Sequence, residues 1–172
     1  NIEISSDRDL EHFRLPVQYV IRPNLDFRGF AGTITSGVIR PGDAVVSLPS
    51  GKTSKVKTIS TFDGDLPEAM AQQAVTLTLE DEIDVSRGDM LVKVGDLPHV
   101  SRGVQAHVIW MAEEQLRLQK QYSIKFVSKK AVGKIVAIEH KIDVNTLEKN
   151  ATDVDSLQLN EIALCDLSFE TP

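Results

Sequence analysis

The Gly-Lys-Thr triplet at residues 51–53 is the part of the chain that most directly suggests chemistry. The same three residues end the loop with which many nucleotide-binding proteins hold phosphates. The complete loop has another glycine five positions before Gly51, and Val46 stands there instead. The loop must also open a helix whose N-terminus faces the phosphates. Because Pro49 and Ser50 precede the triplet between two β-prone runs, we expect a hairpin turn rather than a phosphate site.

Other groups able to do acid–base, metal or nucleophilic chemistry lack the spacing that such chemistry needs. Asp63-Gly64-Asp65 has no calcium-loop spacing and predicts a turn. Cys165 stands in an alternating apolar pattern, which favours a small core residue over a nucleophile. The other groups are dispersed histidines without zinc-ligand spacing and an acidic run expected to be solvated: His12, His99, His107, His140, Glu80, Asp81, Glu82 and Asp84. We therefore predict no catalytic residue, metal site or cofactor site in these residues.

Composition points to a soluble globular protein, with 41% apolar and 26% charged residues. A net charge of −6 argues against broad binding to nucleic acid. A local basic patch of Lys125, Lys129, Lys130 and Lys134 stays possible, although a solvated strand face is the commoner structure for such a run. The single cysteine excludes an internal disulfide and favours a reducing compartment. We find no signal-peptide pattern and no apolar run near the length of a membrane span, and we expect a cytoplasmic protein.

The elements that must position any site are strands, because period-two alternation dominates the first hundred residues. Pro-Gly-Asp at 41–43 and Arg-Gly-Asp at 87–89 both predict turns that lead into strands. A first strand, 13–22, is expected to put Phe13, Leu15, Val17, Tyr19 and Ile21 on one face. Further strands are expected at 34–39, 44–48, 52–59, 75–79 and 90–94. Short strands at this spacing predict a closed barrel or a sandwich.

A break at residues 94–98 is the expected domain boundary, after which the alternation restarts. Strands are expected at 104–110, 122–126, 132–142 and 162–169, with short helical turns at 7–12 and 155–159. A closed barrel normally needs about five or six strands, so we expect the second barrel to be incomplete. Its open edge would then invite pairing with another chain.

Six long stretches of this chain resemble one protein family, the large subunit of bacterial sulfate adenylyltransferase, which is the GTPase component of ATP sulfurylase. They are residues 13–20, 22–33, 61–66, 81–89, 108–113 and 142–147. A shorter Gly-Thr, Gly and Pro-Gly-Asp pattern within them is shared with elongation factor Tu and related translation GTPases. The resemblance implies an all-β fold of two consecutive antiparallel β-barrels, of the type found in domains 2 and 3 of elongation factor Tu.

The resemblance also implies a division of the chain, in which residues 1–12 are the tail of a preceding GTPase domain. Residues 13–97 form the first barrel, and residues 98–172 form the second, incomplete barrel. The family implies that a smaller catalytic subunit is the partner, and that the two subunits make adenosine 5′-phosphosulfate and pyrophosphate from ATP and sulfate, coupled to GTP hydrolysis. GTP and Mg²⁺ would belong to the GTPase domain, whose motifs these residues lack. We expect this portion to be inactive alone.

A glycine-flanked loop after the first expected strand is our candidate interface with the GTPase domain or the small subunit. Its expected contact residues are Asn24, Asp26, Phe27, Arg28 and Phe30. The alternative function is that of barrels that bind tRNA in a translation elongation factor. The acidic balance and the family-specific stretches weigh against it.

Overall fold

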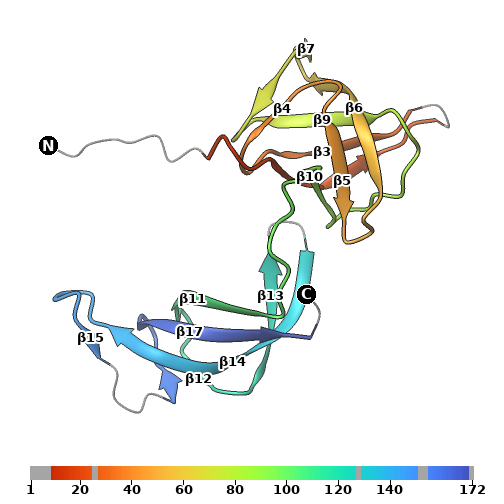
Figure 1. Cartoon of the computed structure of the whole chain (residues 1–172). Coiled ribbons are helices and arrows are strands. Elements are labelled where there is room, and N and C mark those ends of the chain that lie inside the picture. Colours follow the sequence, from red (N-terminus) through yellow and green to blue (C-terminus); the bar gives the residue numbers. More distant parts are fainter. Residues whose placement is uncertain (1–8, 25–26, 127–128, 151–154, 171–172) are drawn as a thin grey trace, which may run out of the picture. The chain divides into compact units, whose positions relative to one another are not determined.

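The fold is all-β, as predicted. The computed structural model describes residues 9–24, 27–126, 129–150 and 155–170, and within them it contains strands, turns and bends without a helix (Figure 1). These residues divide into two compact units, with the main boundary between Pro98 and His99. Each unit has its own sheet and its own apolar core.

The first unit is built from short antiparallel strands. Its largest sheet has the order β1-β10-β5-β6-β9-β3-β2, with β7 beside β6, and β4 pairs with β8 separately. The strands are β1 (Arg14–Pro16), β2 (Tyr19–Ile21), β3 (Gly29–Thr33), β4 (Val38–Ile39), β5 (Ala44–Leu48), β6 (Thr53–Thr61), β7 (Gly64–Asp65), β8 (Ala69–Met70), β9 (Ala74–Leu79) and β10 (Met90–Lys93).

The two ends of this sheet, β1 and β2, are separated in sequence by Val17 and Gln18 alone. The Val17 amide donates to the carbonyl of Asp89, 2.8 Å away, and the Gln18 amide donates to the carbonyl of Ala31, 2.9 Å away. The chain therefore passes directly from pairing with β10 to pairing with β3, and the sheet curves back on itself around the core.

This crossing corrects the single strand expected at 13–22. Phe13, Leu15 and Val17 are fully buried as predicted, but Tyr19 is 64% exposed, and Val20 packs against the core in its place. The face that points inward changes because the chain switches neighbours at Val17–Gln18, which interrupts the alternation of a regular strand.

Strand β3 was not predicted, because its glycines suggested a turn. Gly32 faces the end of β1: a Cβ atom on it would lie 2.3 Å from the carbonyl oxygen of Pro16. Glycine is thus required for close approach of two strands. The strand expected at 34–39 is reduced to β4, since the chain turns at Gly37, whose φ is +77°.

The Gly-Lys-Thr triplet lies in a hairpin turn, as expected. The Gly51 amide donates to the carbonyl of Ser47 at 2.7 Å, and the Ser47 amide donates to the carbonyl of Lys52 at 2.9 Å. Strands β5 and β6 flank this turn, so no helix follows the triplet.

In the second unit, the main sheet has the order β11-β17-β14-β13, with β15 beside β14, and β12 pairs with β16. The strands are β11 (Gly103–Ile109), β12 (Leu116–Arg117), β13 (Gln121–Phe126), β14 (Lys129–Ile142), β15 (Lys149–Asn150), β16 (Ser156–Leu157) and β17 (Ile162–Phe169). The four predicted strands correspond to β11, β13, β14 and β17.

Its core joins two leucines from the small β12–β16 pair to the main sheet. Leu116, Leu157, Ala163 and Cys165 are fully buried. Trp110 packs at the edge of this core, with its ring 5.6 Å from that of Tyr122, in an edge-to-face arrangement.

Neither predicted helical turn forms within the described residues. Where 155–159 was expected to turn, β16 pairs with β12 and buries Leu157, because tertiary burial outweighs a weak local preference. Of the turn expected at 7–12, residues 7 and 8 lie outside the described residues. The rest is a bend in which the Asp9 carboxylate accepts from the amides of Glu11 (2.9 Å) and His12 (3.3 Å).

Candidate interface site

The candidate loop joins β2 to β3, and an asparagine organises it. The Asn24 side-chain oxygen accepts a hydrogen bond of 2.9 Å from the backbone amide of Phe27. Such a bond from a side chain to the backbone three residues later is a common way for asparagine to stabilise a turn. Asp26, also predicted as a contact residue, lies outside the described residues.

Phe27 presents part of an aromatic ring to solvent, with 37% of its surface exposed. The ring rests against the backbone at Gly29: a Cβ there would lie 3.0 Å from Phe27 Cε1 and 2.7 Å from Thr76 Cγ2. Gly29 therefore leaves the space in which the ring lies over β3. A supported, half-exposed aromatic ring is suited to contact a partner at low entropic cost.

Arg28 connects the loop to the segment before β10. One of its terminal nitrogens lies 3.4 Å from a carboxylate oxygen of Asp84 and 3.4 Å from the carbonyl of Val85, both long hydrogen bonds. The guanidinium also lies over the Phe30 ring, 5.6 Å from its centre. Its Nε is buried and has no hydrogen-bond partner among the described residues. Arg28 thus acts partly as a brace within the first unit.

Phe30 is a core residue, which corrects its predicted place among the contact residues. Its side chain is 1% exposed within the first unit and belongs to the main apolar cluster. In strand β3, Phe30 pairs with Val20 and Leu77. Its ring lies under the Arg28 guanidinium and at the wall of the cleft described next, with almost none of its area open to solvent.

A cleft of about 500 Å³ adjoins Phe27 and Arg28 on the same unit. Polar residues of β6 and β9 line it with them, and these include Lys57, Thr58, Ser60 and Thr78, which no sequence motif marks. Thr58 and Thr78 share a hydrogen bond of 2.7 Å between their hydroxyls. Only the register that places Thr58 opposite Thr78 brings these residues together.

The acidic run also reaches this cleft, through Glu80, Asp81 and Glu82. All three are exposed, as expected for a solvated run. Asp81 is fixed by Ser54, which donates to its carboxylate at 2.9 Å while the Asp81 amide donates back to the Ser54 hydroxyl at 3.1 Å. The cleft offers an aromatic edge and both signs of charge, which suits contact with a protein surface.

No group of three or more potential ligand side chains is placed to hold a metal ion in the part of the chain that the structure describes. Among those residues there is also no helix with the length and apolar character needed to cross a membrane.

Comparison with protein families assigns each unit separately. Residues 31–92 match the family described as elongation factor Tu domain 2, and residues 103–172 match the GTP-eEF1A C-terminal domain-like family. The two matched ranges lie on either side of the boundary between the units.

Curated relatives match the chain from end to end. Sulfate adenylyltransferase subunit 1 of Chromobacterium violaceum is 59% identical over 172 residues, which are 99% of this chain and 36% of the relative. The subunits of Alteromonas mediterranea and Teredinibacter turnerae are 56% and 53% identical, cover 100% and 98% of this chain, and are likewise matched over 36% of their own length. The chain is homologous to part of sulfate adenylyltransferase subunit 1. It spans about a third of the length of these relatives.

Two solved structures of Sup35 share the fold of this chain. Sup35 complexed with GDP matches 95% of this chain with a TM-score of 0.83, and Sup35 complexed with GMPPNP matches 99% with a TM-score of 0.77. Sequence identity is 17% and 16%, so this likeness concerns the fold alone. The family predicted from the six stretches is thus confirmed by sequence, and the translation-type fold is confirmed by structure.

Proposed function

We propose that these residues are the non-catalytic β-barrel portion of a GTP-dependent subunit of sulfate adenylyltransferase. The observation that carries the proposal is identity of 53–59% to subunit 1 proteins over essentially the whole chain. The matched length includes both units.

In this proposal, the whole enzyme joins ATP and sulfate to give adenosine 5′-phosphosulfate and pyrophosphate in sulfate assimilation. The chemistry takes place on a smaller catalytic subunit, in the cytoplasm. GTP and Mg²⁺ bind to a GTPase domain outside these residues, and hydrolysis of GTP drives the unfavourable synthesis. The 172 residues alone are inactive.

The contribution of the first unit is mechanical. A sheet that curves around a packed core resists deformation, so it moves as a body when a neighbouring domain changes state. The loop of Asn24, Phe27 and Arg28 is held to that body by the Asn24 turn, by Gly29 and by the Arg28 contacts to Asp84 and Val85. A surface fixed in this way can transmit a displacement to the GTPase domain or to the small subunit.

The test uses the intact two-subunit enzyme with the double substitution Phe27→Ala and Arg28→Ala. We expect the amount of adenosine 5′-phosphosulfate formed per GTP hydrolysed to fall about fivefold or more, the range of ordinary coupling between sites. The control replaces an exposed phenylalanine and an exposed arginine outside the candidate loop in the same unit, Phe62→Ala and Arg40→Ala, and should leave the ratio unchanged. Unchanged coupling together with unchanged affinity between the subunits would refute the interface role.

A further inference from the structure

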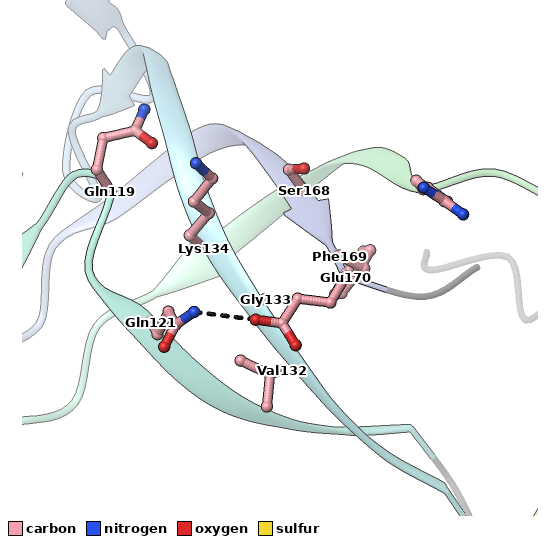
Figure 2. Close-up of a pocket in the computed structure, with 9 residues that line it drawn as sticks. Gln119, Gln121, Val132, Gly133, Lys134, Ser168, Phe169 and Glu170 are labelled. Carbon is pink, nitrogen blue, oxygen red and sulfur yellow. Dashed lines mark hydrogen bonds between the residues drawn. The ribbon is translucent and has the colours of Figure 1, made fainter.

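The second unit has a polar pocket that the proposed function does not use. It has a volume of about 560 Å³, within the range of small-molecule sites, and it is formed where β13, β14 and β17 meet (Figure 2). All the lining residues belong to the second unit: Arg102, Gln119, Gln121, Val132, Gly133, Lys134, Ser168, Phe169 and Glu170.

Lys134 brings an ammonium group into this pocket. It lies on β14 directly opposite Ser168 on β17, and Figure 2 shows the polar ends of both side chains on the same side of the pocket as Gln119. Every ion pair found among the described residues is formed by other cations, so no described carboxylate lies within pairing distance of the Lys134 ammonium group. Of the four lysines singled out as a possible basic patch, Lys134 lines this pocket.

Glu170, the acidic residue that lines the pocket, already accepts a hydrogen bond. Gln121 donates from its side-chain nitrogen to a carboxylate oxygen of Glu170, 2.9 Å away, on the opposite side of the pocket from Lys134 (Figure 2). The other charged lining residues are Lys134 and Arg102, so the lining carries two cations and one carboxylate, and the carboxylate already accepts a hydrogen bond. This balance favours an anion.

Gln119 has a backbone conformation that is unusual for its residue type. Its φ is +62°, and its amide donates to the carbonyl of Ile135 at 2.9 Å, which fixes it against β14 beside Lys134. Residues other than glycine adopt this conformation rarely, and such residues cluster at ligand-binding positions. The side chain of Gln119 ends in a carboxamide that can donate two hydrogen bonds, and the Ser168 hydroxyl can donate one.

We propose that this pocket binds an oxyanion, that is, a phosphate or sulfate group. The Lys134 ammonium pairs with its charge, while the Ser168 hydroxyl and the Gln119 carboxamide donate hydrogen bonds to its oxygens. Arg102 adds a second positive charge to the lining. The group can come from a free inorganic anion or from a phosphorylated small molecule, and the volume has room for either.

The experiment is a titration of the 172-residue chain, followed by two-dimensional amide NMR at constant ionic strength set with chloride. Inorganic phosphate, sulfate, pyrophosphate and AMP are the probes. We expect saturable shifts at the amides of Gln119, Gly133 and Ser168, with a dissociation constant of about 1 mM or below for at least one probe. Tighter binding of AMP than of phosphate would identify a phosphorylated molecule as the source, and the reverse would identify a free anion.

Two variants and one control make the test specific. Lys134→Met and Ser168→Ala should each weaken binding, the former about tenfold or more, while Lys149→Met, which removes an exposed lysine of β15 outside the pocket, should not. The amide spectra of the variants check that they fold. Three results would overturn the proposal. They are binding that does not saturate, equal binding by the Lys134→Met variant, and no binding when the full-length subunit is titrated in the same way. None of these outcomes bears on the coupling experiment, so the two proposals fail separately.

Discussion

Arg14 and Asp96 are joined by two hydrogen bonds, of 3.0 and 3.2 Å, although 82 residues separate them in the chain. His12 adds a third contact, with its Nδ1 2.9 Å from the same carboxylate. Arg14 begins β1, and Asp96 follows β10 just before the boundary between the units. The carboxylate therefore ties the chain entering the first unit to the chain leaving it.

Titration of Asp96 tests this contact. The Arg14 hydrogen bonds, with a smaller contribution from His12, hold the pKa of the Asp96 carboxyl below its ordinary value of 3.8. A lowered pKa means that the contact stabilises the fold above pH 3.8 and that this stabilisation is lost as pH falls through the folded-state value.

In the wild-type chain, carboxyl NMR should therefore show the Asp96 midpoint below 3.8. In an Arg14→Gln variant the midpoint should move upward toward that value. A midpoint that does not move on this substitution would show that Arg14 is not the cause.

Alanine substitutions of two phenylalanines compare a core position with a surface position in the first unit. Phe30→Ala removes a side chain that is 1% exposed and should lower the free energy of unfolding by about 3–5 kcal/mol. Phe62→Ala removes one that is fully exposed between β6 and β7, and it should change that free energy by about 0.5 kcal/mol or less. Urea unfolding followed by NMR signals of first-unit residues measures both. Similar losses in the two variants would contradict the placement of Phe30.

Alanine substitution at Gly37 tests the turn before β4, and the same substitution at Gly42 is its control. At Gly37, φ is +77° and an added Cβ would lie 2.3 Å from the Cα of Phe13, so Gly37→Ala combines backbone strain with a clash against backbone. We expect a loss of about 3 kcal/mol or more in the free energy of unfolding. Gly42 has φ +88° but open space around it, so Gly42→Ala should cost about 1 kcal/mol. Equal costs for the two would show that the contact with Phe13 relaxes freely.

The thiol of Cys165 should be unreactive in the folded protein. Burial, helped by the neighbouring Asp166 charge, raises the pKa of this thiol to about 11, from an ordinary value of 9.0. Labelling by a thiol reagent at neutral pH should be slow until denaturant unfolds the second unit. Since the folded state keeps its proton longer than the unfolded state, stability should fall between pH 9.0 and about 11 in the wild type, and less in a Cys165→Ala variant. Fast labelling without denaturant would contradict this burial.

Local sequence was sufficient for the strands whose neighbours do not change along their length. In β9, Val75 and Leu77 are buried as alternation predicted. The turn at Gly51 lies where Pro49 and Ser50 predicted it. It was not sufficient where a strand changes partner: Tyr19 points outward because the chain leaves β10 for β3 two residues earlier. Phe30 was misplaced for a related reason, since its glycine neighbours allow close packing rather than a turn.

The amino-acid sequence by itself determined the all-β class, most strands and turns, and the family. Those properties follow from period-two alternation, from the backbone preferences of glycine and proline, and from residue identity along contiguous stretches. Only the tertiary structure decided that Arg14 meets Asp96, that Thr58 faces Thr78 beside the candidate loop, and that Lys134 and Ser168 line one pocket. Such pairs depend on strand register and sheet order, which arise from packing of the whole core and leave no periodic signal in the chain.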